Sequence, residues 1–174
     1  READTDLFSP KKKKSKGDTA ASPVSKENLA IAKSWLASSD EYNLLVNGTA
    51  ITAFPVYYQN DLALLRQSLR IVQAGTEVAE VKGKDLIPAH GLAMSRLLKT
   101  SVFSTEALTY EQAIAYLRKE AIVLPPSVPK GYVLVTYKEI PLGFVKNIGN
   151  RANNLYPQEW RIRSGYLPDD IRTL

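Results

Sequence analysis

Two apolar runs, at residues 42–46 and 50–54, stand on either side of the dipeptide Asn47-Gly48. An Asn-Gly pair in this position is a strong signal of a two-residue β-hairpin, because both residues tolerate a positive φ. Pro55 ends the second run, since proline cannot donate to a strand ladder. The first third of the chain therefore predicts an antiparallel strand pair.

A second hairpin is predicted near the C-terminus. Residues 133–137 and 140–145 are strand-like, and Lys138-Glu139 stands between them as the turn. Gly143 interrupts the second strand, as a bulge or a site of close approach does. Two hairpins this far apart in the sequence favour antiparallel or mixed sheets.

Short amphipathic helices are predicted around these hairpins. Thr109 and Gln112 form a capping box, which marks the start of one helix. In another helix, which starts at residue 60 or 61, Leu62, Leu65 and Leu69 share one face. The remaining helices are expected at residues 26–37 and 89–98, and the capped one ends near residue 120.

Further short strands complete the expected elements. Gly75–Lys84 alternates apolar and polar residues and contains a glycine turn. Shorter strands are expected at residues 71–72, 86–88 and 122–124. This order of elements favours an α+β fold with two small domains on antiparallel or mixed sheets, the second of them a β-barrel with short helices.

Composition removes several classes of chemistry. The 174 residues contain no cysteine and one histidine, His90, so thiolate ligands, cysteine nucleophiles and histidine-rich metal sites are excluded. No GxGxxG, GxxxxGK[ST], HExxH or GxSxG motif is present. No apolar run approaches the ~20 residues that cross a bilayer. We expect no catalytic residue, no metal site and no membrane association, and a cytoplasmic location.

Basic charge is concentrated in residues 137–163. This stretch holds five basic and two acidic residues, so it supplies +3 of the net charge of +5. Asparagines and the aromatic residues Tyr156 and Trp160 are interleaved with the cations. Cations bind phosphate, amides read base edges and rings stack on bases, so this composition is typical of RNA binding. Solvated surface charge is the alternative.

One segment within this stretch concentrates the signal. Lys146 lies two residues after Phe144 and so on the same face of the predicted strand. Residues 151–155 are expected to form one helical turn, which would aim Arg151 and Asn154 in similar directions. A strand-end lysine beside such a turn suits the recognition of RNA shape and exposed bases.

The domain boundaries follow changes in composition. Residues 1–24 carry four consecutive lysines and few large apolar residues, and they predict a disordered basic linker. We expect a first α+β domain at 25–100, a second domain at 101–168 and a tail at 169–174. Because the sequence starts at Arg1 without a methionine, we also expect it to be part of a longer protein.

Two motifs carry a family resemblance. The run PLGFVKNIGNRANNLYPQEWR resembles the C-terminal PUA-like domain of bacterial ribosomal RNA cytosine-C5 methyltransferases, the RsmF-like branch of the Nop/Sun group. The run GTEVAEVKGKDLIPAHGLAM is similar to the accessory domain that precedes it in that family. The resemblance covers residues 27–163.

The resemblance implies a division of labour. In the family a separate domain binds S-adenosylmethionine, and its cysteine attacks C6 of the target cytosine. This sequence has neither a cofactor loop nor a cysteine. The chain would then position ribosomal RNA for an N-terminal methyltransferase domain of the same parent, without binding a cofactor itself.

Matched to the family motif, the residues expected to contact RNA are Lys146, Asn147, Arg151, Asn153, Asn154, Tyr156 and Arg161. A possible second contact involves Lys82, Lys84 and His90, although a lone histidine is more often structural. Trp160 departs from the leucine expected there, and we expect it in the core. The alternative function is a protein-interaction or scaffolding module, which an exposed apolar patch would indicate.

Overall fold

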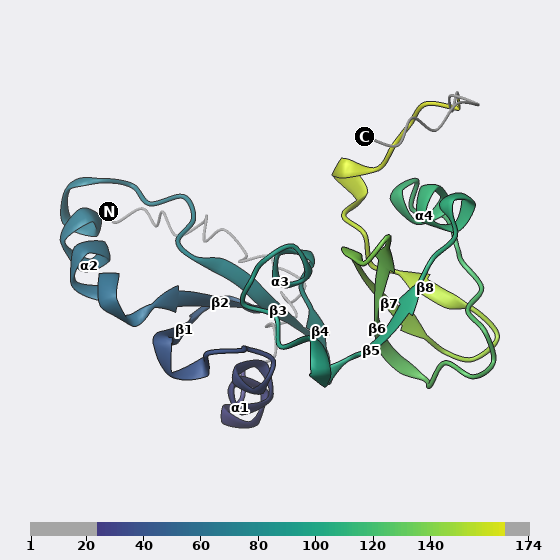
Figure 1. The fold of residues 1–174 in the computed structure, drawn as a ribbon. Coiled ribbons are helices and arrows are strands. Elements are labelled where there is room, and N and C mark those ends of the chain that lie inside the picture. Colours follow the sequence, from purple (N-terminus) through teal and green to yellow (C-terminus); the bar gives the residue numbers. More distant parts are fainter. Residues whose placement is uncertain (1–23, 166–174) are drawn as a thin grey trace, which may run out of the picture.

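A computed structural model describes residues 24–165 of the chain. The predicted basic linker, apart from its last residue, and the predicted tail at 169–174 lie outside these residues. Two four-stranded sheets lie side by side, one formed by β1 to β4 and the other by β5 to β8 (Figure 1). The α+β prediction is confirmed.

The first sheet is antiparallel throughout and follows chain order. It contains β1 (Tyr42–Asn47), β2 (Ala50–Pro55), β3 (Thr76–Lys82) and β4 (Asp85–Pro88). Asn47 pairs with Ala50, so the hairpin turn is Gly48-Thr49, one residue later than expected. Gly48 has a φ of 60°, which glycine adopts without strain.

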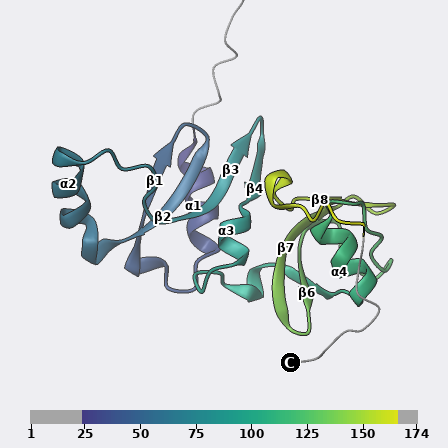
Figure 2. The ribbon, with the colours of Figure 1, turned by 90° about the horizontal axis from the view of Figure 1, so that it is seen from above.

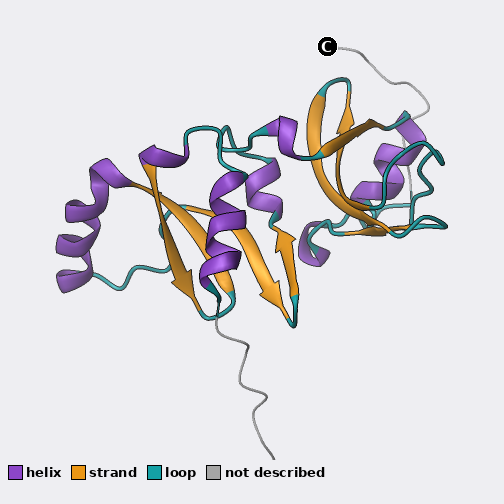
Figure 3. Ribbon diagram, turned by 90° about the horizontal axis from the view of Figure 1, so that it is seen from below, coloured by secondary structure: helices purple, strands orange, loops and turns teal. Residues whose placement is uncertain are grey.

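Two helices cover one face of this sheet. Figure 3 shows α1 (Lys26–Ser34) and α3 (His90–Ala93) crossing that face, with the longer α2 (Gln59–Ser68) beyond the β1 edge. Ser25 caps α1 by accepting from the Asn28 N–H at 3.1 Å. The predicted helix at 89–98 is wrong beyond residue 93, where the chain continues as turns.

The α2 region differs from expectation in burial. Only Leu62 is buried on this helix, whereas Leu65 and Leu69 are about half exposed. The strand expected at 71–72 is wrong, because Val72 is 95% exposed and no neighbouring strand pairs with it. Helical spacing predicted the helix but could not show that the rest of the described chain leaves most of its apolar face uncovered.

The second sheet is mixed. It contains β5 (Ser104–Ala107), β6 (Gly131–Tyr137), β7 (Ile140–Asn147) and β8 (Ala152–Asn154); β5 runs parallel to β6 and the other pairs are antiparallel. The hairpin through Lys138-Glu139 is confirmed, and both turn residues have positive φ. Pairing runs from β5 to β8 without joining those two strands within the described residues, so we describe a mixed sheet and not a closed barrel.

The helical turn expected at 151–155 is wrong. Residues 152–154 instead form β8, in which Asn153 pairs with Lys146 of β7. The edge of β7 offers backbone groups that an extended segment can satisfy and a single helical turn cannot. Arg151 and Asn154 therefore do not share a direction, because residues three apart on an extended chain point to opposite faces.

The predicted capping box is confirmed at the start of α4 (Tyr110–Leu117). Thr109 N–H donates to Gln112 Oε1 at 3.0 Å, and Gln112 N–H donates to Thr109 Oγ1 at 3.3 Å. The strand expected at 122–124 is reduced to one bridge between Ile122 and Ala152. Short 3₁₀ turns occur at Ser39–Glu41, Val56–Tyr58, Thr100–Val102 and Gln158–Trp160, the last labelled η4.

The second sheet contributes to two cores through its two faces. Val133, Val135 and Val145 pack in the cluster that includes α4, whereas Leu134 and Phe144 join the core of the first sheet. Burying each such side chain stabilises the fold by about 1.5–3 kcal/mol. The expected division near residue 100 stays a prediction, since the sheets on either side of it share a core.

Candidate nucleic-acid interface

Gly143 of β7 marks the point where the two sheets meet. Its φ is 143°, and a Cβ at this position would lie 2.9 Å from Nδ1 of His90 and would overlap the hydroxyl of Tyr116. Tyr116 Oη donates to the Phe144 carbonyl at 3.2 Å. The close approach expected at Gly143 is therefore made by two ring side chains. His90 belongs to the unit built on the first sheet, and Tyr116 belongs to the unit built on the second sheet.

His90 joins the first unit to the C-terminal segment. As the first residue of α3, it packs edge-on against Tyr156 at 5.1 Å and Trp160 at 5.3 Å between ring centroids. Its Nδ1 is buried without a hydrogen-bond partner among the described residues. Burial lowers the pKa of His90, so the imidazole is neutral near pH 7.

A groove of about 810 Å³ lies beside this contact. One side is formed by β3, β4 and the start of α3, and the other by residues 155–160 together with Lys119. Figure 2 shows η4 next to β4, where the two sides face each other. Glu77, Glu80 and Lys82 line it on the first sheet.

Trp160 stands at this groove and is 60% exposed. The expectation that it lies in the core is wrong, because η4 turns the ring outward after Pro157, where it meets the ring of His90 nearly at right angles. An exposed tryptophan beside polar groups offers a stacking face to a planar ligand.

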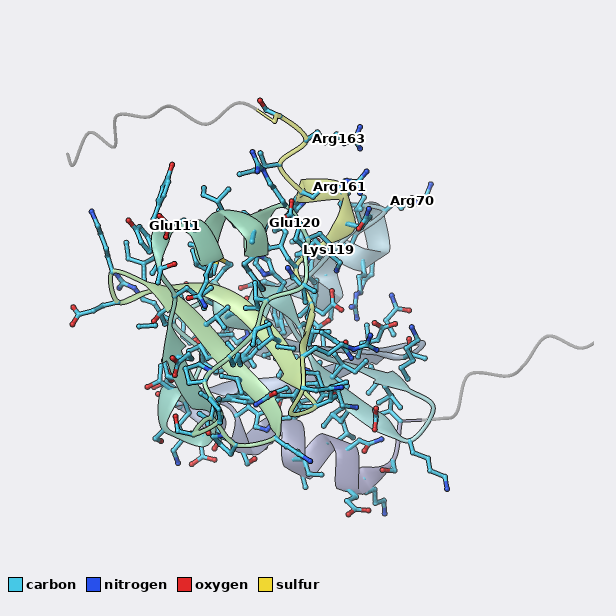
Figure 4. The ribbon with its side chains drawn as sticks, turned by 90° about the vertical axis from the view of Figure 1, so that its right-hand side faces the viewer. Arg70, Glu111, Lys119, Glu120, Arg161 and Arg163 are labelled. Carbon is cyan, nitrogen blue, oxygen red and sulfur yellow. The ribbon has the colours of Figure 1, made fainter. Side chains whose placement is uncertain are left out.

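Arginines gather around a second hollow, of about 350 Å³, next to the groove. Arg118, Arg161 and Arg163 line it together with Glu120. Arg118 Nη2 donates to the carbonyls of Ser164 and Gly165 at 2.9 and 3.2 Å, which holds the C-terminal segment against α4. Figure 4 shows Arg161 and Arg163 following one another along this segment, on the same side of the molecule as Lys119.

Two of the asparagines that were expected to contact RNA already use their side-chain amides in hydrogen bonds within the fold. The Asn147 amide donates to the carbonyls of Val128 and Pro129, and its oxygen accepts from the Gly149 N–H. The Asn154 amide donates to the carbonyls of Tyr116 and Glu120, and its oxygen accepts from the Tyr156 N–H. Asparagine side chains often satisfy turn backbone in this way, so both fix the chain around β8.

Lys146 is paired with an acid of the first unit. Its Nζ lies 2.6 Å from Oδ2 of Asp85 and 5.5 Å from the ring centroid of Tyr132. The hydrogen bond to Asp85 raises the pKa of Lys146. Its positive charge is therefore partly compensated.

Three residues that were expected to contact RNA have exposed side chains that make no hydrogen bond or ion pair within the described part of the chain. They are Arg151, Asn153 and Arg161. Arg151 lies at the β7–β8 turn, whereas Arg161 follows η4 and lines the second hollow. Lys82 lines the groove and Lys84 occupies the exposed β3–β4 turn. Tyr156 is half-buried, and its carbonyl accepts from Nζ of Lys119. RNA contact by these residues stays a prediction.

Sequence reasoning missed several residues of the groove. Lys119 follows α4 with a φ of 66°. Glu77 and Glu80 belong to β3, which the sequence predicted from its valines and not from its acids. The described residues contain no cluster of three or more His, Asp or Glu side chains that could hold a metal ion. In the same residues no helix is long and apolar enough to span a membrane.

The fold and the groove define a class: an α+β unit joined through a shared core to a PUA-type domain. Residues 103–162 match the family described as "Methyltransferase RsmF PUA domain". The resemblance inferred from the sequence is confirmed.

Curated relatives extend the similarity beyond this domain. Ribosomal RNA small subunit methyltransferase F of Enterobacter sp. (strain 638) is 29% identical over 138 residues, which are 79% of this chain and 27% of that protein. The protein of the same name from Shigella boydii serotype 4 (strain Sb227) is 26% identical over 160 residues, 92% of this chain and 30% of the relative. The chain thus spans less than a third of the length of these relatives.

Proposed function

We propose that this chain is an RNA-binding accessory region of a ribosomal RNA methyltransferase. The observation that carries the proposal is the groove, in which the exposed Trp160 stands with Lys82 and Lys119 beside a PUA domain of the RsmF family. The groove also carries Glu77, Glu80 and Glu159, and a stacking face with lysines beside it suits single-stranded or splayed RNA. Arg161 and Arg163 extend this positive surface along the C-terminal segment.

The finer role is to orient RNA for a separate catalytic domain. The relatives are named as methyltransferases and are more than three times as long as the part matched here. The resemblance implies a cysteine nucleophile and S-adenosylmethionine in that other domain, and this chain has no cysteine. Because Leu134 and Phe144 join the core of the first sheet, the two units would hold RNA as one body.

The test is binding of a structured ribosomal RNA fragment to the 174-residue chain at several salt concentrations. Replacing Lys82, Arg161 and Arg163 with alanine should weaken binding at least about tenfold and reduce the slope of log K against log salt by about 2. The matched control replaces the exposed Lys26, Lys33 and Lys99, which removes the same charge elsewhere. Equal loss in both variants would show a diffuse charge effect and no defined site.

A second candidate function rests on the α2 region. Seven large apolar side chains within 17 residues are substantially exposed there: Val56, Tyr57, Tyr58, Leu64, Leu65, Leu69 and Val72. An apolar surface of this kind marks a protein contact. We assign it to the methyltransferase domain of the parent, because the relatives contain a long further portion that this chain does not match.

Hydrogen exchange of the α2 amides tests this assignment. Exchange should be fast in the 174-residue chain and slower in the full-length parent, because docking suppresses local opening. Unchanged exchange in the parent would contradict the assignment. A dimer of the isolated chain that Leu65→Lys dissociates would identify a second copy as the occupant instead.

A further inference from the structure

We propose that the groove between β3 and η4 binds one unpaired nucleobase that presents an amino group, stacked on Trp160 and hydrogen-bonded to Glu77 or Glu80. This inference rests on the proposed RNA-binding function and names the part of RNA that enters this site. Three observations carry it: the exposed ring, the acidic lining and the cations around them.

The exposed ring of Trp160 is held in place by neighbouring rings. Trp35, the other tryptophan, is 6% exposed in the first core, whereas Trp160 is 60% exposed. Trp160 meets His90 nearly edge-on, with an interplanar angle of 77°, and His90 is itself held by Tyr156. The two rings are thus nearly perpendicular, and Trp160, at 60% exposure, still offers ring surface for stacking on a base.

The acidic lining selects for bases over phosphates. Glu77 and Glu80 come from the same strand, and no salt bridge within residues 24–165 involves either of them. Burial, and secondarily the charge of Glu80, raises the pKa of Glu77. Two unpaired carboxylates repel a phosphate, but an ionised carboxylate accepts hydrogen bonds from amino and imino groups.

The donors that each base offers to a carboxylate predict which bases bind most tightly. Guanine presents adjacent N1–H and N2–H donors, and cytosine and adenine each present one amino group. Uracil presents a single N–H between two carbonyls, which a carboxylate disfavours. The groove volume of about 810 Å³ falls in the usual range for small-molecule sites and admits a nucleotide.

The cations lie where the phosphates on either side of such a base would pass. Lys82 and Lys119 line the groove, and Arg161 and Arg163 line the adjacent hollow of about 350 Å³. The groove thus holds Glu77, Glu80 and Glu159 together with two lysines, and the arginines line the hollow beyond it, so base and backbone would meet different side chains. A uniformly basic surface would bind the backbone without distinguishing bases.

The experiment uses the 174-residue chain and four RNA hairpins with one stem, which differ only in a single unpaired loop nucleotide. Emission of Trp160 reports stacking, since Trp35 is buried. Hairpins with unpaired G, C or A should bind at least about fivefold more tightly than the U hairpin and should quench emission. Trp160→Ala should weaken binding about tenfold, and Trp160→Phe should restore most of it.

The acidic residues are tested by Glu77→Gln with Glu80→Gln, which should reduce the preference over U to less than about twofold while binding persists. Circular dichroism checks that each variant is folded. If the unaltered chain binds all four hairpins equally, or if neither substitution changes binding or preference, the base-binding inference is wrong and the RNA-binding function stands. If the unaltered chain binds no RNA at physiological salt, the proposed function itself is wrong.

Discussion

Nζ of Lys146 lies 2.6 Å from Oδ2 of Asp85, so an ion pair connects β7 of the second sheet to the start of β4 in the first. Both side chains are partly exposed, at 35% and 57%. Such surface pairs contribute little to stability because water screens them. The carboxylate instead competes with any phosphate for this lysine.

Asp85→Asn should therefore raise the affinity for RNA about two- to fivefold, if Lys146 contacts RNA as its sequence position predicts. The reason is that the lysine is then free to pair with phosphate. Binding at fixed salt measures the effect, with Asp40→Asn as a control for the charge change at another surface site. An unchanged affinity would mean that Lys146 only links the sheets.

Gly143→Ala should destabilise the fold by about 2–4 kcal/mol, because the new methyl group has to displace His90 or Tyr116 in a tightly packed contact. Gly131→Ala is the matched control: its φ of 121° is also positive, but a Cβ there meets nothing within 4 Å. Urea unfolding of both variants separates steric overlap from backbone strain. Equal losses of stability in the two variants would show that the strain of a positive φ alone explains the glycine at position 143.

The elements with a local capping or turn signal were predicted correctly. Thr109 with Gln112 predicted the start of α4, and Lys138-Glu139 predicted the second hairpin, since capping and turn chemistry depend on a few neighbouring residues. β5 was missed because a four-residue parallel strand has no turn signal of its own. β8 was taken for a helical turn although its partners on β7 lie only five to nine positions earlier, because a three-residue strand is too short to show alternation.

The candidate site was less predictable, for a physical reason. Composition shows that a residue can bind RNA but not whether the fold already uses its polar groups. Asn147 has the right chemistry and is 5% exposed, whereas Trp160 was expected in the core and is 60% exposed. Burial and exposure depend on contacts that are distant in sequence: Asn147 bonds to residues 18 and 19 positions earlier, and Trp160 contacts His90, 70 positions earlier.

Stability should fall as the pH is lowered from 7.5 to 5.5, partly through His90. Burial lowers its pKa in the folded state, so the unfolded chain takes up a proton first, near its ordinary value of 6.5. The contribution of neutral His90 to the free energy of unfolding is thus fully present above pH 6.5. This contribution is lost as the pH falls below 6.5. His90→Gln should show a smaller change in urea midpoint across this range, and an identical pH profile would contradict the assignment.

The shared core predicts that both units unfold together. Leu124 packs only in the α4 cluster, and Leu124→Ala should cost about 2–5 kcal/mol. In a Trp160→Phe background, Trp35 is the only tryptophan and reports on the first core. Its unfolding midpoint should shift with Leu124→Ala as far as the circular dichroism midpoint does. A shift confined to circular dichroism would show two independently stable domains.

The asparagines of the C-terminal stretch should separate into two kinds. Asn147→Ala removes three partly buried hydrogen bonds, so it should destabilise the fold by about 1–3 kcal/mol. Asn153 is exposed on β8, and Asn153→Ala should leave the free energy of unfolding within about 0.5 kcal/mol. If Asn153 contacts RNA, its variant alone should bind RNA more weakly when both proteins are measured fully folded. Urea unfolding and RNA titration on the same preparations distinguish the two effects, and a loss of binding in Asn147→Ala without loss of stability would reverse the assignment.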